Sequence, residues 1–238
     1  MDFLTHLCIA GKLKRIVRKE LDVKLNTFSF LLGNVKPDIS SKYVNIPHFK
    51  KDSNDFVRNE IKSILYCRVY QGKRCTHDFS ERLGIITHYI SDFFCYAHSG
   101  HFTGSMAEHY LYEISMMLKN IRNPGNLACS CSRSHIAENG NLNSIFNYID
   151  TLNDEYLSAF TGQEADSIKS HPEESRNKES HKELHAKESR FMETDMAYTM
   201  KACVFLCLSV ISECLASEES ISDLAYDYDM EHNWDTLT

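Results

Sequence analysis

Two pairs of potential metal ligands stand at helical spacing in the middle of the sequence. His88 and Asp92 are four residues apart, and so are His109 and Glu113. Residues four apart on a helix lie on the same face, so each pair can converge on one ion. His98 lies between the two pairs and is placed to share an ion with the later one. Imidazole nitrogen combined with carboxylate oxygen is typical of zinc at a hydrolytic site.

Core histidines that are satisfied by hydrogen bonds are the competing interpretation of these pairs. The residues that flank them imply burial, because they are aromatic or aliphatic: Tyr89, Ile90, Phe93, Phe94, Tyr110 and Leu111. A buried ionisable group needs a partner or a metal. Two pairs with a histidine between them therefore favour a metal site over isolated core histidines.

Earlier segments offer further ligands of the same kinds. Asp38 follows Pro37, which places its carboxylate on a rigid turn, and His48 follows Pro47 ten residues later. His6 stands close to the start of the sequence. These positions extend the candidate metal site to the N-terminal part of the chain.

In this order, the candidate ligands resemble those of the zinc-dependent phospholipases C, a family related to the P1-type nucleases. The resemblance rests on a His-x3-Asp-x5-His element, a His-x3-Glu element and the ligands before them, namely His6, Asp38, His48, His88, Asp92, His98, His109 and Glu113. It covers residues 1 to about 115. It implies an all-α single domain of the phospholipase C and P1 nuclease type, with the metals bound between helices.

The resemblance also implies two to three zinc ions and a division of the ligands among them. One zinc would be held by Asp38, His48, His88 and Asp92. A second would be held by His98, His109 and Glu113. A third would be held by His6, by Asp92 as a bridge, and by the backbone amine and carbonyl of Met1. The family has Trp at this first position, but the chelating atoms belong to the backbone.

The function implied is phosphodiester hydrolysis by zinc-activated water, with Asp38 orienting or deprotonating that water. We expect cleavage of a phospholipid head group, because Glu113 is the residue of the phospholipase branch whereas the nucleases have Asp. Ile39 stands where the best-known members have an aromatic residue of the choline pocket, so the head group stays open. The alternatives are a single-strand nuclease or nucleotidase using the same zinc cluster, and a non-catalytic metal-binding helical protein.

The elements that must position these residues are predicted to be helices. The chain has only 9 Gly and 4 Pro in 238 residues, few for a turn-rich β fold. Apolar periodicity predicts helices at 9–21, 26–32, 54–70, 80–97, 105–120, 142–161 and 194–216. Ser80 is the expected N-cap of the helix that carries His88, Asp92 and, near its end, His98.

One segment breaks this pattern. Residues 163–190 are rich in Ser, Glu, Lys and His, which predicts a polar insertion or lid within a single domain of residues 1–238. His181 and His185 have ligand spacing there, but a solvated charged face is the favoured interpretation, and Cys129 and Cys131 are interpreted as loop cysteines.

Charge and cysteine content limit the partners and the compartment. The net charge of −7 argues against holding nucleic acid by bulk electrostatics, so no stable nucleic-acid complex is expected. The expected partner is a phospholipid or another phosphodiester, with transient contact to a membrane surface; the oligomeric state is left open. The 9 scattered cysteines favour a reducing compartment. With no signal-peptide pattern visible and the most apolar stretch, 202–212, too short to cross a bilayer, we expect a cytoplasmic protein.

Overall fold

The computed structural model describes residues 1–67, 69–71, 74–122, 142–167 and 178–232. Helices dominate, and the predicted all-α class is confirmed; the strands form one hairpin of two-residue segments. In chain order the elements are α1 (Phe3–Leu21), α2 (Thr27–Gly33), α3 (Lys36–Ile39), α4 (Lys50–Ile64), β1 (Tyr70–Gln71), β2 (Arg74–Cys75), α5 (His77–Asp92), the 3-10 helix η1 (Tyr96–His98), α6 (Met106–Arg122), α7 (Leu142–Ser167) and α8 (Lys178–His232).

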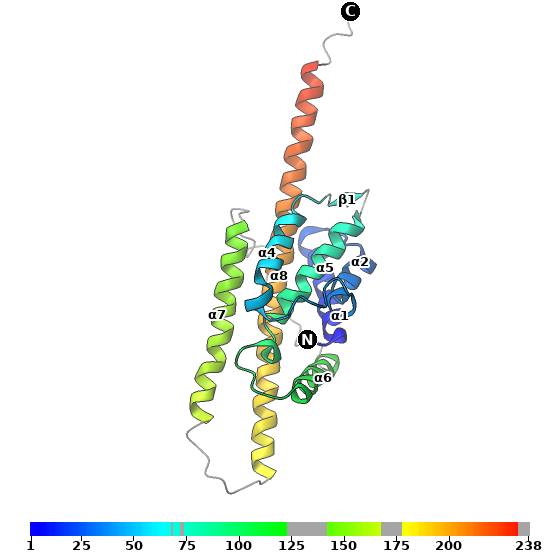
Figure 1. Cartoon of the computed structure of the whole chain (residues 1–238). Helices are drawn as coiled ribbons and strands as arrows, with labels where there is room; N and C mark the ends of the chain where they lie inside the picture. Colours follow the sequence, from blue (N-terminus) through cyan, green and yellow to red (C-terminus); the bar gives the residue numbers. More distant parts are fainter. Residues whose placement is uncertain (68, 72–73, 123–141, 168–177, 233–238) are drawn as a thin grey trace, which may run out of the picture.

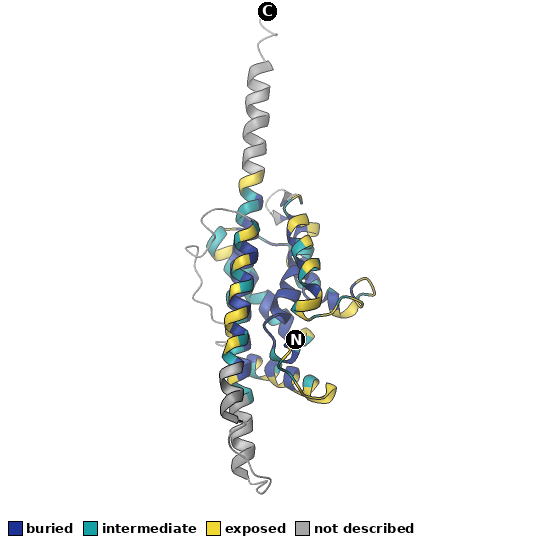
Figure 2. Ribbon diagram, turned by 60° about the vertical axis from the view of Figure 1, so that its left-hand side comes forward, coloured by how far each residue is buried: buried dark blue, intermediate teal, exposed yellow. Residues whose placement is uncertain are grey.

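The long helix α8 forms the axis of the molecule (Figure 1). Helix α7 runs along one side of it, and α1 and α5 pack against it as well. The middle of α8 is almost continuously apolar and buried, with Met200, Val204, Leu206, Val210 and Ile211 in the core. Figure 2 shows buried ribbon in the middle of this bundle, next to the N-terminus. The N-terminal helices are therefore held on a hydrophobic support that lies well away from them in sequence.

The apolar part of α8 is longer than the sequence prediction of 202–212. Within the described residues, Glu188–Ser217 is long and apolar enough to span a bilayer by length and composition. However, 72% of its most apolar window is buried inside the protein. That burial is typical of a core helix, because its apolar side chains already contact other helices rather than solvent.

Helix α5 ends earlier and begins earlier than predicted. Its N-cap is Thr76, whose side chain accepts from the Phe79 amide, while the Ser80 hydroxyl accepts from the Asn26 amide. The helix stops at Asp92, so His98 lies on η1 and not on the same helix. Tertiary hydrogen bonds hold the chain after Asp92: Asn153 donates to the Phe93 carbonyl, and the Tyr96 amide donates to Asp195. These distant hydrogen-bond partners could not be predicted from the local sequence pattern.

Most of the other helix ends also differ from the predictions, by one residue at α2 and by 16 at both ends of α8, which was predicted to span 194–216. Helix α1 begins at Phe3, because the Asp2 carboxylate caps it by accepting from the amides of Leu4 and Thr5. Helix α4 occupies 50–64 instead of 54–70, and the chain then turns into the hairpin. Helices α2 and α6 agree with the predictions of 26–32 and 105–120 to within two residues, and α7 extends beyond 161.

Two glycines let α2 approach α5 closely. A Cβ atom at Gly33 would lie 2.2 Å from the Glu81 carbonyl oxygen, and one at Gly84 would lie 2.5 Å from the Phe30 carbonyl oxygen. Side chains at either position would force the helices apart. The contact brings Asn34, the residue after α2, to the side of α5 that carries His88.

The polar segment 163–190 is only partly described. Helix α7 reaches Ser167 and α8 begins at Lys178, and residues 168–177 lie outside the described part of the chain. Cys129 and Cys131 also lie outside it, as do the side chains of His181 and His185. The insertion or lid, and the extent of the domain over residues 1–238, therefore stay predictions.

Candidate metal centre

The predicted ligands meet at one place, where the C-terminal end of α5 faces the N-terminus of the chain. They come from six different parts of the structure. Met1 precedes α1 and His6 lies on it; Asp38 lies on α3; His48 precedes α4; His88 and Asp92 lie on α5; His98 lies on η1; His109 and Glu113 lie on α6. The structure brings every one of them into a single cluster.

Asp92 is the centre of this cluster. Its Oδ2 lies 2.8 Å from His48 Nδ1 and 3.3 Å from His88 Nε2. Its Oδ1 lies 3.4 Å from His6 Nε2 and 3.5 Å from His98 Nδ1. The same oxygen accepts a short hydrogen bond from the Met1 amine. One carboxylate therefore touches groups from α1, α5, η1 and the loop before α4, as a bridging ligand would.

On one side of Asp92 the cluster continues to Asp38. Asp38 Oδ1 lies 3.8 Å from His48 Nδ1 and 3.6 Å from His88 Nε2, and these two nitrogens are 3.4 Å apart. The donor atoms of the three residues all lie within 4.8 Å of one another. About a quarter of the Asp38 side chain is exposed, 25%, whereas His88 and Asp92 are fully buried. This side of the cluster therefore opens to solvent at Asp38.

On the other side the cluster continues to the residues of η1 and α6. Glu113 Oε1 lies 2.9 Å from both His98 Nε2 and His109 Nε2, and the two imidazole nitrogens are 3.2 Å apart. The Met1 amine lies 3.3 Å from the same carboxylate oxygen. The sequence spacing predicted that His98 would join the later pair, and the structure places it there.

Two of the buried imidazoles are held in a defined tautomer by residues that the sequence analysis missed. The Nδ1 of His88 donates to the Asn34 carbonyl over 2.8 Å, which leaves its Nε2 lone pair toward Asp92 and Asp38. The Ser91 hydroxyl donates to the His88 carbonyl, so it accepts from His6 Nδ1 at 3.0 Å. Partners of this kind orient metal-ligating histidines. Ser91 stands three residues after His88 in the sequence, but the position of Asn34 depends on tertiary packing alone.

Two ring nitrogens in the cluster are buried and make no hydrogen bond within the described structure. They are His6 Nε2 and His98 Nδ1, both beside Asp92 Oδ1. A buried polar atom without a partner is costly, so such atoms are rare unless they bind something. Neutral imidazole nitrogens beside carboxylate oxygens form a donor set that suits zinc. The residues present therefore fit a zinc cluster.

The charge states of His88, His98 and Asp92 agree with this interpretation, whereas contacts with Asp92 and Asp38 raise the pKa of His48. Burial lowers the pKa of His88 well below its usual value and that of His98 to about 4, so both rings are neutral. Burial alone would raise the pKa of Asp92, but the Met1 amine and the neighbouring imidazoles hold that pKa well below its usual value. Neutral imidazoles and ionised carboxylates are the forms that bind metal.

Cys95 is a further potential ligand that the sequence analysis did not select. It is fully buried, and its sulfur lies within 4.8 Å of donor atoms of His98 and Glu113. Burial raises the pKa of this thiol well above its usual value, so without a metal it is protonated. Its only sequence signal was its place three residues before His98, which does not distinguish it from the other apolar cysteines of this chain.

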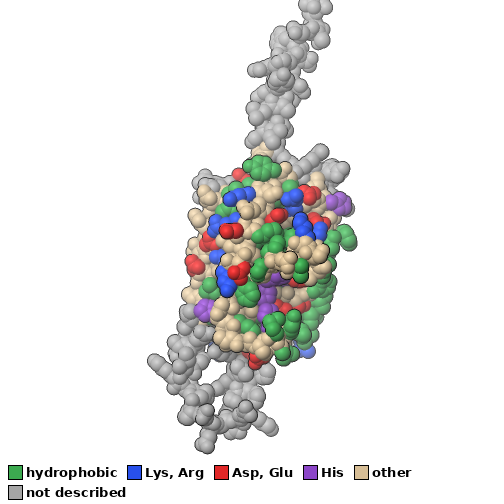
Figure 3. All heavy atoms as spheres, in the orientation of Figure 1, with side chains coloured by type: hydrophobic (Ala, Val, Ile, Leu, Met, Phe, Trp, Pro, Cys, Tyr) green, Lys and Arg blue, Asp and Glu red, His purple; other side chains and the backbone are tan. Residues whose placement is uncertain are grey.

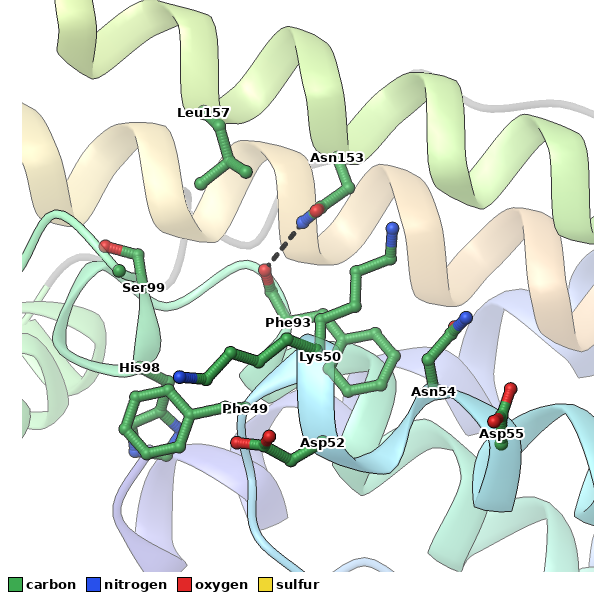
Figure 4. Close-up of a pocket in the computed structure, with 12 residues that line it drawn as sticks. Phe49, Lys50, Asp52, Asn54, Asp55, Phe93, His98, Ser99, Asn153 and Leu157 are labelled. Carbon is green, nitrogen blue, oxygen red and sulfur yellow. Dashed lines mark hydrogen bonds between the residues drawn. The ribbon is translucent and has the colours of Figure 1, made fainter.

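A pocket of about 430 Å³ adjoins the cluster at His98. Figure 4 shows Phe49 lying against His98 at one end, and the ring centroids of these residues are 6.0 Å apart. Lys50, Lys51, Asn153 and Leu157 line other parts of the pocket. The cluster is therefore reached from a cavity that offers both aromatic and cationic groups.

Comparison with known proteins defines the class. The family described as "Zinc dependent phospholipase C" matches residues 5–160, well over half of the chain. The protein therefore belongs to the zinc-dependent phospholipase C family, as its ligand order predicted. The match extends past the 115 residues that carried the resemblance and into α7. Neither the curated proteins nor the solved structures contain a significant match.

Proposed function

We propose that this protein is a zinc-dependent phosphodiester hydrolase that cleaves the head group from a phospholipid, as a phospholipase C does. The observation that carries the proposal is the convergence of carboxylates and imidazoles on Asp92, with two buried ring nitrogens that lack a hydrogen-bond partner in the described structure. Membership of the zinc-dependent phospholipase C family supports the same chemistry.

The proposed ligand sets follow the contacts in the cluster. Asp38, His48, His88 and Asp92 would hold one zinc, and His98, His109 and Glu113 a second. A third would be held by the Met1 amine and carbonyl, His6 and Asp92. When bound, zinc lowers the pKa of a coordinated water to about 7 and stabilises charge on phosphoryl oxygens.

Asp38 is the proposed proton acceptor. It is the most exposed acidic member of the cluster, so water and substrate can reach it. Burial raises the pKa of its carboxyl group, which makes the carboxylate a better base than a free aspartate. Its Oδ1 also lies 3.6 Å from His88 Nε2, so a water molecule that it orients would lie beside the proposed zinc ligands.

The pocket beside His98 is the proposed binding site for part of the substrate. Phe49 offers an aromatic face, and Lys51 Nζ lies 5.9 Å from the centre of that ring. A phospholipid has an anionic phosphodiester between an apolar part and a polar head group, and this pocket combines surfaces for both kinds of group.

Zinc analysis of the purified protein with a free Met1 amine tests the metal centre directly. Two to three zinc ions per chain are expected, together with hydrolysis of bis-p-nitrophenyl phosphate. The variant Glu113→Gln should be more than about a hundredfold less active, because it removes the negative charge of a carboxylate that contacts both His98 and His109. Glu155→Gln, at an exposed acid on α7, is the matched control and should behave as the wild type.

The substrate class is tested with monomeric short-chain phosphatidylcholine and single-stranded oligonucleotides. Faster cleavage of the phospholipid supports the proposal. Cleavage of the oligonucleotide alone would make the protein a nuclease with the same cluster. A zinc-loaded protein that cleaves no phosphodiester would have a structural or sensing metal site.

A further inference from the structure

Helix α6 exposes an unusual number of large apolar side chains. Six of them are between 41% and 65% exposed, on a helix of 17 residues: Met106, Tyr110, Leu111, Ile114, Leu118 and Ile121. We call these residues the α6 apolar face. Contiguous apolar surface of this kind marks an interaction site in a folded protein.

The α6 apolar face contains no charged residue. At 100° per residue, its members fall in an arc of about 140°, which also contains Ala107 and Met117. The charged residues Glu108, Lys119 and Arg122 lie outside that arc. A helix face that is continuously apolar and exposed fits an apolar environment better than it fits water.

The α6 apolar face borders the metal centre. Tyr110 and Ile114 each follow a candidate ligand, His109 and Glu113, by one position. At 100° per residue, Glu113 lies about 20° from the Met106 edge of the arc, so the α6 apolar face begins beside the ligand face. Met1, whose amine lies in the cluster, is followed closely by Phe3 and Leu4, which are both exposed.

The same arrangement recurs on the other side of the cluster. Ile39 follows Asp38 and Phe49 follows His48, and both are exposed. We call the α6 apolar face, together with Phe3, Leu4, Ile39 and Phe49, the apolar rim. Figure 3 shows histidine side chains at the surface with hydrophobic side chains beside them. Ten of the thirteen exposed large apolar side chains of the described structure thus belong to the apolar rim.

We propose that the apolar rim seats the protein on a phospholipid layer, with the α6 apolar face entering the boundary between head groups and acyl chains. This inference rests on the proposed function, because docking on a phospholipid layer would bring the substrate of that function to the mouth of the site. A second copy seated on the same rim would cover the cluster and exclude substrate. The lack of charge in the α6 arc implies that apolar burial, and not attraction to anionic lipid, drives the contact.

Flotation with phosphatidylcholine vesicles tests the docking surface without requiring turnover. The combined variant Leu111→Ser, Ile114→Ser, Leu118→Ser removes three exposed side chains outside the proposed zinc ligands. It should bind vesicles at least about tenfold more weakly than the wild type. Binding of the wild type should be nearly the same at low and high salt, because screening affects charge attraction and not apolar burial.

The matched control is Phe28→Ser. Phe28 is 73% exposed, and its helix begins beside His77, about three turns of α5 from His88. This variant should bind vesicles as the wild type does. All three proteins should hydrolyse monomeric short-chain phosphatidylcholine at the same rate and unfold at the same temperature.

Several outcomes would overturn the docking proposal. They are a wild type that does not float with vesicles, a triple variant that floats equally well, and a wild-type dimer that the triple variant converts to monomer. A lower unfolding temperature of the triple variant would show that the face is packed within the protein. If vesicle binding responds as expected but monomeric phospholipid is not cleaved, the docking surface stands and the proposed hydrolysis fails.

Discussion

Asp92 and Asp195 are both fully buried carboxylates, but their surroundings differ. Asp92 is surrounded by the Met1 amine and four imidazoles, and its pKa is held well below the usual value. Asp195, on α8, accepts hydrogen bonds from the hydroxyls of Tyr112 and Tyr156 and from the Tyr96 amide. Burial raises its pKa to about 7, although these three donors act in the opposite direction.

The difference shows that burial alone does not identify a functional carboxylate. Nitrogen ligands that can share a cation surround Asp92, whereas hydroxyl and amide donors from α6, α7 and η1 surround Asp195 and satisfy it. Asp195 thus holds α8 against η1 and α6, which carry His98, His109 and Glu113, and against α7. We interpret Asp92 as the bridge of the metal centre and Asp195 as a structural hydrogen-bond centre.

The largest expected effect comes from replacing the bridge. Asp92→Asn removes the negative charge that the amine and imidazoles share, so we expect loss of zinc and a fall in phosphodiesterase activity of more than about a thousandfold. Metal analysis and hydrolysis assays measure both. Asp195→Asn is the control, since it also replaces a buried aspartate by an uncharged amide. Equal zinc loss in the two variants would contradict the assignment of Asp92 as the bridge and of Asp195 as a structural residue.

A smaller effect is expected from extending the chain before Met1. The Met1 amine donates to Asp92 and lies 3.3 Å from Glu113, within a buried site. Burial alone would lower its pKa, but the carboxylates of Asp92 and Glu113 raise it to about 12. A Gly-Ser extension turns the amine into an amide, so one zinc per chain should be lost while the others remain. Equal zinc content with and without the extension would refute Met1 as a ligand; the same extension at the C-terminus is the control.

The smallest effect is expected from Asp195→Asn, and it depends on pH. The pKa of Asp195 is raised from 3.8 to about 7 in the folded protein, so the folded state keeps a proton that the unfolded state releases. The stability of the wild type therefore decreases as pH rises from about 4 to about 7 through this group. Asn does not titrate, so the difference in free energy of unfolding between the wild type and Asp195→Asn should shrink by about 3 kcal/mol between about pH 5 and about pH 8.

Thermal unfolding of both proteins across this range measures the difference between them. Groups common to both chains cancel in the comparison. If Asp195→Asn instead becomes less stable relative to the wild type as pH rises, the three donors hold Asp195 ionised in the folded state. Zinc content should be the same in the two proteins at every pH.

Much of the candidate site was predictable because its ligands stand in short motifs. The pairs His88–Asp92 and His109–Glu113 are each carried by one helix, so their spacing alone defines a common face. Asp38 and His48 were found through their order along the chain, and the structure places both beside His88. The family match confirms the class that this order indicated.

The orienting residues were not predictable in the same way. Asn34 reaches His88 only because Gly33 and Gly84 let two helices approach closely. His98 was expected on the helix of His88, but hydrogen bonds from Asn153 and to Asp195 end that helix at Asp92. Cys95 lies beside the cluster as a result.

The sequence by itself determined the helical class, the identity and order of the candidate ligands, and the family, because these depend on residue types and on spacings within one or two turns of helix. Only the tertiary structure decided that Asp92 is the shared centre, which ring nitrogens face it, and that an uncharged apolar rim borders the ligands. Those features join segments up to about a hundred residues apart, such as Met1 and Asp92. Contacts over such separations form through the packing of whole helices, which no local pattern of residues specifies.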